Sequence, residues 1–378
     1  MALKGERLDR PTYDILKSSL GNGTTGEVIL TFHEIFGKEI VQKTVSLLGN
    51  PDGVAKSEPR VLESLDHPHL INVREAQWDP EKDLSLECIT FTSDYYPGRC
   101  IHHALSIDGH RFSVGDTLAI VEGILDALNY LHETRNLLHR DIKPPNVMLD
   151  EARRHAYVGD LGSAATRDAA GQAKPYGGTP LYQPPEAAAG TLDVRSDLYG
   201  VGAVMVEMLN GPHDYENIDR DSVDRRLALG RRALPDRFYR PAPWVPAPVV
   251  SVLRRLVAAK PADRYQSAHE ALRAVRDIRC VSWVQVSGGG LVGCWQGNYP
   301  THLSPAQTRV YQVTAAPVTS GRHAGMVSYV ARWRHKDAVD WRNYASLATR
   351  APEDDDRALA AFFREVEAKA HSAPTSRR

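Results

Sequence analysis

The sequence predicts an α+β chain in three consecutive parts, and three observations indicate this. Residues 1–96 are rich in short β-type segments separated by glycine turns. Residues 97–280 carry apolar residues at helical spacing, most clearly in a helix expected over 114–133, and further helices are expected over 198–209, 249–258 and 268–278. Residues 281–378 return to strand-like segments and end in a further helical one. We therefore expect a β-rich unit, a mostly helical unit and a small α+β domain.

A glycine-rich run opens the β-rich part. It has the pattern G-x-G-x-x-G-x-V, and its main positions are Gly21, Asn22, Gly23, Gly26 and Val28. Glycines let a β-hairpin close over phosphate oxygens, with backbone N–H groups directed at negative charge. The run therefore predicts a phosphate-binding hairpin.

A third β-type segment follows the hairpin at 39–43, after a turn near Gly37. Val41 and Lys43 lie on this segment among apolar neighbours. We therefore expect an inward, half-buried position for Lys43.

The most informative segment follows the long predicted helix. It reads L-H-R-D-I-K-P-P-N at 138–146. One short loop thus holds a candidate base, Asp141, a cation, Lys143, and a metal-ligating amide, Asn146. Downstream, a short apolar strand ends in D-L-G at Asp160. Asp160 and Asn146 are hard oxygen ligands, so with a triphosphate they suit Mg²⁺, with Mn²⁺ as the alternative ion.

Three further segments follow in order. The first is G-T-P-L-Y-Q-P-P-E, which ends at Glu186, the second contains Asp197 and the third contains Arg264. Over roughly residues 10–280 the ordered set resembles the eukaryotic-type protein kinases, specifically the Ser/Thr branch found widely in bacteria. The resemblance implies a bilobal protein-kinase fold, with the β-rich part as the N-lobe and the helical part as the C-lobe.

By this resemblance the activity is transfer of phosphate from ATP to Ser/Thr hydroxyls of proteins, including the chain itself. Asp141 would orient and deprotonate the acceptor hydroxyl, and Lys143 would steady the γ-phosphoryl group. Lys43 would hold the α- and β-phosphates. Asn146 and Asp160 would hold the metal ion.

The resemblance also implies supporting roles. Thr179 would brace the catalytic loop, and Asp197 would cap the backbone of that loop. Glu186 and Arg264 would form a buried ion pair. Arg140 is the kind of arginine that binds a phosphate group carried by the activation segment, which spans residues 160–186. The candidate acceptors on that segment are Thr166 first, then Ser163 and Tyr176.

The connection between the lobes is expected at 91–98. By the same resemblance Ser93 is the gatekeeper of the adenine pocket, and its small side chain predicts a roomy pocket. The backbone from Asp94 to Tyr96 would face the adenine.

The expected partner of Lys43 within the N-lobe is Glu58. Pro59 follows Glu58, and a proline is tolerated only in the first turn of a helix. The helix that carries Glu58 is therefore expected to be short, with Glu58 at its start. Glu63 is the alternative partner.

Residues 281–378 lie outside the resemblance. We expect strands over 281–286, 291–295, 309–313 and 326–333, a hairpin turn at 288–290, and a helix over 353–370. No Asp or Glu occurs from Ile278 to Lys336. The charged residues of that stretch are Arg279, Arg309, Arg322, Arg332, Arg334 and Lys336.

Three roles are considered for this domain. One is docking of a protein, as substrate or regulator, and another is structural support of the C-lobe. The remaining one is binding of nucleic acid, in which aromatic side chains stack on bases. Those side chains would be Trp283, Trp295, Tyr299, Tyr311, Tyr329 and Trp333.

Two alternatives to protein phosphorylation are weighed. A kinase-fold phosphotransferase acting on a small molecule is disfavoured by the peptide-type segment that ends at Glu186. A nucleotide-binding pseudokinase scaffold is disfavoured because the base, the cations and the metal ligands named above are all present.

Composition indicates the setting. A net charge of −1 over 378 residues argues against steering toward nucleic acid or membrane. The four cysteines form no C-x-x-C pair, which favours a reducing cytoplasm. The longest mostly apolar run, 199–209, is shorter than the roughly 20 residues that span a bilayer, so no membrane segment is expected.

Overall fold

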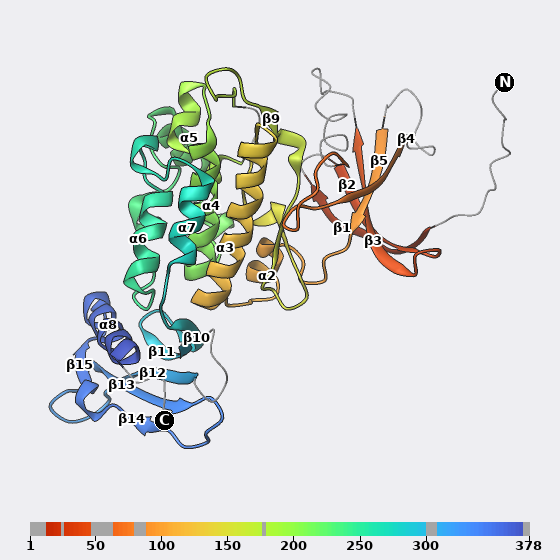
Figure 1. Ribbon diagram of the computed structural model, residues 1–378. Coiled ribbons are helices and arrows are strands. Elements are labelled where there is room, and N and C mark those ends of the chain that lie inside the picture. Colours follow the sequence, from red (N-terminus) through yellow and green to blue (C-terminus); the bar gives the residue numbers. More distant parts are fainter. Residues whose placement is uncertain are drawn as a thin grey trace, which may run out of the picture.

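The computed structural model describes residues 13–23, 26–46, 63–78, 88–175, 179–299 and 308–372. Its first five strands form an antiparallel sheet in the order β1-β2-β3-β5-β4. They are β1 Tyr13–Gly23, β2 Gly26–His33, β3 Lys38–Ser46, β4 Val73–Trp78 and β5 Cys88–Asp94. Figure 1 shows this sheet beside the helical part of the molecule. The expected β-rich first part is confirmed.

The helical part contains one central helix, α3, whose apolar face is buried. Ser113 caps its N-terminus, because its Oγ accepts a hydrogen bond from the Asp116 N–H at 3.0 Å. The α-helix ends at Asn129, earlier than expected, and a π-helical turn over Tyr130–Thr134 continues it. The helices are α2 Ile101–Ser106, α3 Val114–Asn129, α4 Val194–Asn210, α5 Arg220–Ala228, α6 Ala247–Leu256 and α7 Ala268–Arg276.

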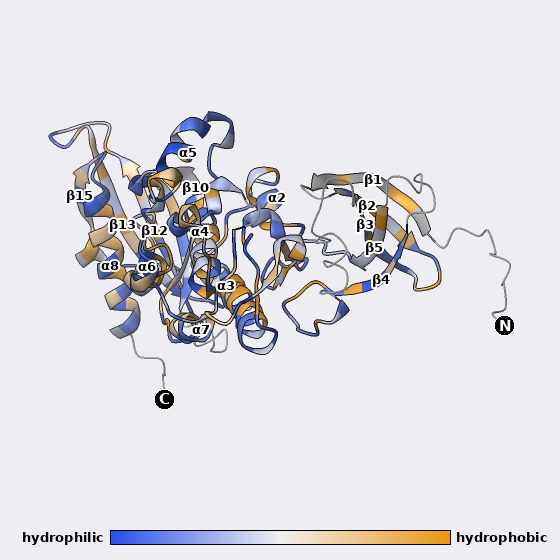
Figure 2. Cartoon of the chain, turned by 90° about the horizontal axis from the view of Figure 1, so that it is seen from above, coloured by the Kyte–Doolittle hydropathy of each residue, from blue (hydrophilic) through white to orange (hydrophobic). Residues whose placement is uncertain are grey.

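Two of these helices, α2 and α5, were not predicted. Both are short, and α5 buries only Val223. Figure 2 shows α5 as largely hydrophilic, in contrast with α3. Without an apolar stripe, the helical period of α5 is not visible in the sequence. α2 does bury Ile101, Ala104 and Leu105, but its six residues are too few to show a period.

Short strands and 3₁₀ turns lie in the loops of the helical part. Two small antiparallel pairs join β6 Leu137–Leu138 to β9 Ala165–Thr166, and β7 Val147–Leu149 to β8 Ala156–Val158. The 3₁₀ turns of this part are Pro144–Asn146, Leu161–Ser163, Pro180–Tyr182, Pro185–Ala189, Tyr215–Asn217, Asp236–Tyr239 and Pro261–Asp263.

The C-terminal part is a six-stranded antiparallel sheet with one helix, as expected for a small α+β domain. The strand order is β10-β11-β12-β13-β14, and β15 pairs with β13. The elements are β10 Ser282–Gly289, β11 Val292–Tyr299, β12 Arg309–Pro317, β13 Met326–His335, β14 Arg342–Asn343, the 3₁₀ turn Ala345–Leu347, β15 Thr349–Pro352 and α8 Asp356–Ser372. The two last strands are short and were not predicted.

One face of this sheet is covered by α8. Phe363 packs edge-on against Trp283 at 5.0 Å and Trp295 at 5.6 Å between ring centroids, and Phe362 lies 5.6 Å from Tyr329. The apolar stripe of α8 therefore packs on the sheet.

The alternative role in which aromatic side chains stack on nucleic acid is not open to four of the six. Trp283, Trp295, Tyr311 and Tyr329 are each 0% exposed. Alternation along the strands places them on the face that α8 covers, so burial of their large apolar area takes precedence over contact with a ligand. The remaining two, Tyr299 and Trp333, are half-buried.

The C-terminal sheet contacts the helical part directly. The Gly115 N–H donates to Ser282 Oγ at 2.9 Å, and Ser282 Oγ donates to Ser113 Oγ at 3.1 Å. Trp244, in the segment before α6, lies 5.4 Å from Trp295. None of the helices in the described ranges combines the length and apolar character needed to cross a bilayer.

Candidate active site

Lys43 and Asp160 meet although they come from different parts of the fold. Lys43 lies on β3, where it pairs with Val28 of β2 and Phe91 of β5. Its Nζ is 3.0 Å from Asp160 Oδ1, and the two side chains are 14% and 21% exposed. Asp160 follows β8 in a left-handed backbone conformation, with φ of 57°. The expected inward position of Lys43 is confirmed.

The charge of Asp160 is set by its neighbours. Burial raises the pKa of this carboxyl, but the ammonium of Lys43, with smaller effects from His139 and Lys143, more than offsets burial and lowers the pKa below its ordinary value. Asp160 is therefore an anion at neutral pH, as a ligand for a divalent cation must be.

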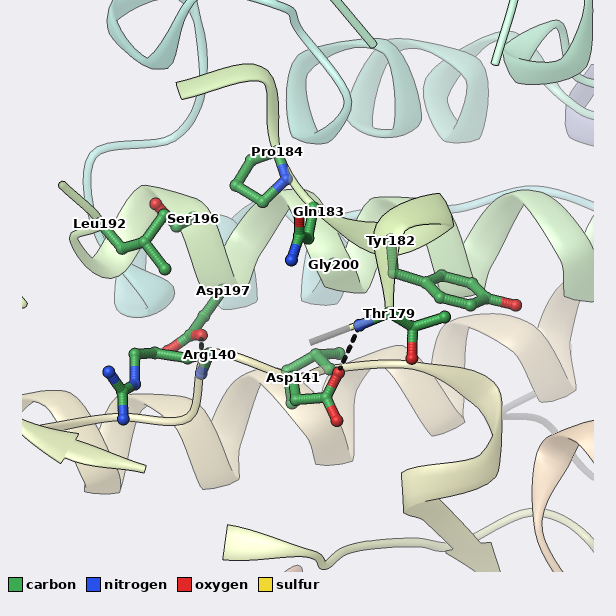
Figure 3. A pocket seen from close by; sticks show the side chains of 11 residues that line it. Arg140, Asp141, Thr179, Tyr182, Gln183, Pro184, Leu192, Ser196, Asp197 and Gly200 are labelled. Atoms are coloured by element: carbon green, nitrogen blue, oxygen red, sulfur yellow. Dashed lines mark hydrogen bonds between the residues drawn. The ribbon is translucent and has the colours of Figure 1, made fainter. Parts of the chain in front are cut away.

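A second cluster surrounds Asp141. Its Oδ2 lies 2.7 Å from Lys143 Nζ and accepts a hydrogen bond from Asn146 Nδ2 at 3.2 Å. Its Oδ1 accepts from the Thr179 N–H at 3.4 Å, and Lys143 Nζ donates to Thr179 Oγ1 at 3.0 Å. Figure 3 shows Asp141 directed at Thr179. The expected bracing by Thr179 is present.

The two clusters are adjacent through the backbone. The Gly159 N–H donates to the Asn146 carbonyl at 2.9 Å, which holds Asp160 next to the catalytic loop. Asn146 uses its Nδ2 on Asp141, both on the carboxylate and on the backbone carbonyl at 2.8 Å. The side-chain oxygen of Asn146 therefore stays available to a cation.

Asp197 caps the backbone of the catalytic loop, as expected. Its Oδ2 accepts from the His139 N–H at 2.9 Å. Its Oδ1 accepts from the Arg140 N–H at 2.7 Å, a contact drawn in Figure 3. His132 Nε2 also donates to Oδ2, at 2.8 Å. Burial raises the pKa of Asp197, but the contact with His132 and the bonds from the loop more than offset this, so its pKa is lowered.

His132 is a supporting residue that the sequence reasoning missed. The available signal was its position on the buried side of the predicted helix, near the helix end. A fully buried histidine needs a hydrogen-bond partner. His139 also has a structural task, since its Nε2 contacts the Gly159 carbonyl at 3.0 Å.

Glu186 and Arg264 form the expected buried ion pair. Arg264 donates to both oxygens of Glu186, at 2.7 and 2.8 Å, and Ser196 Oγ donates to Glu186 Oε1 at 2.9 Å. Arg264 is fully buried. The pair joins the end of the activation segment to the C-lobe.

The glycine-rich hairpin and its surroundings are only partly described. The strands of the hairpin run antiparallel, with Gly21 opposite Val28, Asn22 opposite Glu27 and Gly23 opposite Gly26. Glu58 and Pro59 lie outside the described residues, so the pairing of Glu58 with Lys43 stays a prediction. Glu63, the alternative partner, has an exposed side chain.

Side chains of the lobe connection contact other protein groups. Ser93 pairs with Val41 across β5 and β3. The carboxylate of Asp94 is occupied, since it accepts from Lys38 at 2.9 Å and from Arg74 at 2.6 Å. Burial raises its pKa, but these two cations more than offset burial and lower the pKa. Tyr96 packs on Tyr157, with ring centroids 4.3 Å apart.

Arg140 binds the activation segment through carbonyl groups. Its guanidinium donates to the Ser163 and Lys174 carbonyls, each at 2.5 Å, and to the Ala164 carbonyl at 3.4 Å. Thr166 on β9 is exposed. Tyr176, a further candidate acceptor, lies outside the described residues.

Comparison with known proteins agrees with this geometry. A family model described as "Protein kinase domain" matches residues 15–275. The serine/threonine-protein kinase PknF of Mycobacterium tuberculosis is 27% identical over 325 residues, which cover 80% of this chain and 60% of that protein. The serine/threonine-protein kinase pkn3 of Myxococcus xanthus is 29% identical over 273 residues, 68% of this chain and 48% of that protein. The match spans about half the length of such curated relatives.

Proposed function

The chain belongs to the protein kinase family, and from this premise we propose that it transfers the γ-phosphoryl group of ATP to Ser/Thr hydroxyls of proteins, itself included. The observation that carries the proposal is the convergence of two clusters. Lys43 and Asp160 supply one, and Asp141, Lys143 and Thr179 supply the other. Phosphoryl transfer needs positioning and charge neutralisation more than covalent chemistry, and these side chains provide both.

In the proposed reaction the acceptor hydroxyl lies against Asp141. As its oxygen attacks the γ-phosphorus, the carboxylate takes its proton, the bond from phosphorus to the bridging oxygen of the β-phosphate breaks, and ADP leaves. Lys143 lies between Asp141 and Thr179, so its ammonium would face the transferred group. Lys43 would hold the α- and β-phosphates. The hairpin residues, Val41, Ser93 and the backbone of 94–96 would enclose the nucleotide.

A divalent cation fits the donor set. Asn146 keeps its side-chain oxygen available, and Asp160 is an ionised carboxylate, so both are hard ligands that suit Mg²⁺ or Mn²⁺. Within the described residues no three His, Cys, Asp or Glu side chains gather as a metal site. The ion, when bound with ATP, would neutralise phosphate charge, and its remaining ligands would be phosphate oxygens and water.

The acceptor is proposed to be a peptide rather than a small metabolite. Thr179 and the buried Tyr182 belong to the segment that carries the peptide-type pattern, and both lie over the catalytic loop (Figure 3). The relatives reported above are named as Ser/Thr protein kinases.

The test is phosphate transfer from γ-³²P-ATP by wild type and Asp141→Asn, with acid hydrolysis of labelled protein to identify the phosphorylated amino acid. We expect phosphoserine and phosphothreonine with wild type, and a rate lower by about 10²-fold or more with Asp141→Asn, because orientation and proton transfer are lost. Asp224→Asn, on the exposed side of α5, is the matched control and should keep the wild-type rate. Label confined to small metabolites would reassign the acceptor, and equal rates in wild type and Asp141→Asn would refute the assignment of the base.

A further inference from the structure

A groove of about 700 Å³ lies between the C-lobe and the C-terminal domain. One wall is the proline-rich segment that begins at Arg240 together with α6, and the other is the first part of α8. None of its lining residues lines the pocket around Asp141. Its volume is within the range of about 300–1,000 Å³ that is typical of ligand sites.

The groove is strongly cationic. Arg240, Arg254, Arg357 and Arg364 line it, and Asp356 is its one carboxylate. All four arginines are exposed. Among the residues that the structure describes, none of the four guanidinium groups has an ion-pair or hydrogen-bond partner. Most charged groups elsewhere in the C-lobe do have one, for example the pairs of Arg264 with Glu186 and of Arg276 with Glu122.

The cations are arranged on opposing walls. Arg357 and Arg364 are separated by two helical turns and share one face of α8 with Ala360. The apolar stripe of α8 is turned to the sheet, so this face is a second, separate face of the helix. Arg254 of α6 and Arg240 stand across the groove.

The proline-rich segment supplies an apolar surface at Pro241 and Pro243. Pro241 and Pro243 have no N–H group, and the Ala242 N–H already donates to Asn210 Oδ1 at 2.9 Å. A ligand can therefore not add to this wall as a β-strand. Recognition must come from the arginine side chains, which bind carboxylates in bidentate geometry, and from apolar contact with the prolines and Val250.

We propose that this groove docks an acidic segment, rich in Asp and Glu, of the protein substrates of the kinase. This deepens the proposed function, because it names a class of substrate. A substrate held here would present its acceptor residue at a raised effective concentration to the separate site around Asp141. Specificity would then come from a segment that is distant from the phosphorylated residue.

The test measures binding independently of catalysis. Full-length chain carrying Asp141→Asn is titrated into a fluorescein-labelled peptide that is rich in Glu and Asp and free of Ser, Thr and Tyr. We expect saturable binding by fluorescence anisotropy that weakens as salt rises to about 150 mM. Arg357→Glu combined with Arg364→Glu should weaken binding by about tenfold or more, since charge-assisted hydrogen bonds become like-charge repulsion. Arg254→Glu alone should weaken it in the same direction.

Two controls decide the interpretation. Arg231→Glu combined with Arg273→Glu makes the same charge change at exposed positions outside the groove and should leave the affinity unchanged. A peptide with Gln and Asn in place of Glu and Asp should not bind. Equal loss with both double variants, or no binding of the acidic peptide, would overturn the proposal. Tighter binding of a single-stranded RNA, lost in the groove variants, or self-association of the chain that these variants abolish, would also overturn it.

This outcome is separable from that of the proposed function. If wild type transfers no phosphate but the acidic peptide binds in the groove, the docking site stands and the proposed activity fails. If transfer occurs and the groove variants bind the peptide as wild type does, the activity stands and the docking proposal fails. In an active chain, the groove variants should raise the KM for a substrate with an acidic tail while leaving kcat unchanged.

Discussion

The guanidinium of Arg264 is held by hydrogen bonds at each of its nitrogens. Its side chain is fully buried and donates to the two oxygens of Glu186, to the Arg195 carbonyl at 3.0 Å, and to the Ala258 and Ala259 carbonyls at 2.7 and 3.1 Å. Every donor direction of the guanidinium is used. A buried cation of this kind depends on its anionic partner.

We expect Glu186→Ala to lower the free energy of unfolding by about 3–5 kcal/mol, because Arg264 would keep its charge without its counter-ion. Urea denaturation followed by circular dichroism measures this. The matched control is Glu122→Ala, which removes the exposed partner of Arg276 and should cost about 1 kcal/mol or less. A cost for Glu186→Ala as small as that of the control would contradict the prediction.

Glu367 makes the stability of the C-terminal domain depend on pH. Its carboxylate accepts from the Val281 N–H at 3.1 Å and from Trp283 Nε1 at 2.8 Å. Burial raises its pKa from 4.5 to about 7, and these two hydrogen bonds only partly oppose the shift. The ionisable groups around it are Cys280, Tyr299, Tyr311 and His371.

The folded chain therefore holds the proton of Glu367 more tightly than the unfolded chain does. Its contribution to stability is present in full below about pH 4.5 and is lost as the pH rises through about 7. We expect Glu367→Gln to flatten the pH dependence of the urea midpoint between about pH 5 and about pH 8, on a scale of up to roughly 3 kcal/mol. Parallel curves for wild type and Glu367→Gln would show that another group is responsible.

At the residue scale, the positions proposed for catalysis could be found in the sequence because residue type and order along the chain identify them. Asp141, Lys143 and Asn146 lie within one loop, so the sequence already placed them together. The contact of His132 with Asp197 was not predictable, since it joins the end of α3 to α4 and depends on how those helices pack.

At the element scale, the first turn of α3 is in direct contact with strand β10. Gly115 is in the first turn of α3, and a Cβ there would lie 2.4 Å from Ser282 Oγ and 3.0 Å from Ser282 Cβ. Such a contact cannot be relieved by turning the serine side chain alone, because its Cβ is also too close. The hydrogen bond from the Gly115 N–H to Ser282 Oγ depends on this close approach.

We expect Gly115→Ala to push β10 away from α3 and to lower the free energy of unfolding by about 1–3 kcal/mol, the usual cost of overpacking. Differential scanning fluorimetry would show a lower thermal midpoint. Gly289→Ala is the control, since a Cβ there meets no atom within 4 Å. An unchanged midpoint for Gly115→Ala would mean that β10 is not held at α3.

The elements that the sequence predicted are those with a strong period. α3, α4, α6 and α7 present apolar stripes, and β10 to β13 alternate, so each was found with errors of a few residues at the ends. α5, β14 and β15 were missed because they are short and bury little, and α2 was missed because it has only six residues. Their conformation follows from tertiary contacts rather than from their own pattern.

At the scale of the whole molecule, one hydrophobic cluster runs through the C-lobe and into the C-terminal domain. Trp244 on one side and Trp295 on the other form a contact across the boundary. The division into 1–96, 97–280 and 281–378 stays a prediction, but this shared core means that the last two parts should not unfold independently.

We therefore expect a single transition for the C-lobe and the C-terminal domain in differential scanning calorimetry. Trp244→Ala should lower its midpoint, because it leaves a cavity beside Trp295 at a cost of about 2 kcal/mol or more. Trp341→Ala, whose ring contacts the guanidiniums of Arg332 and Arg334, should cost less. Two resolved transitions for these parts in the wild type would contradict the idea of a shared core.

The sequence by itself determined the family and the identity of the residues proposed for phosphate transfer, and it predicted the three-part organisation. It could do so because these depend on residue type and order along the chain. Only the tertiary structure decided that the aromatic side chains of the C-terminal domain form its core and that four arginines from separate segments share one groove. Burial and convergence depend on which faces of the elements are covered, and that is set by packing between residues distant in the chain.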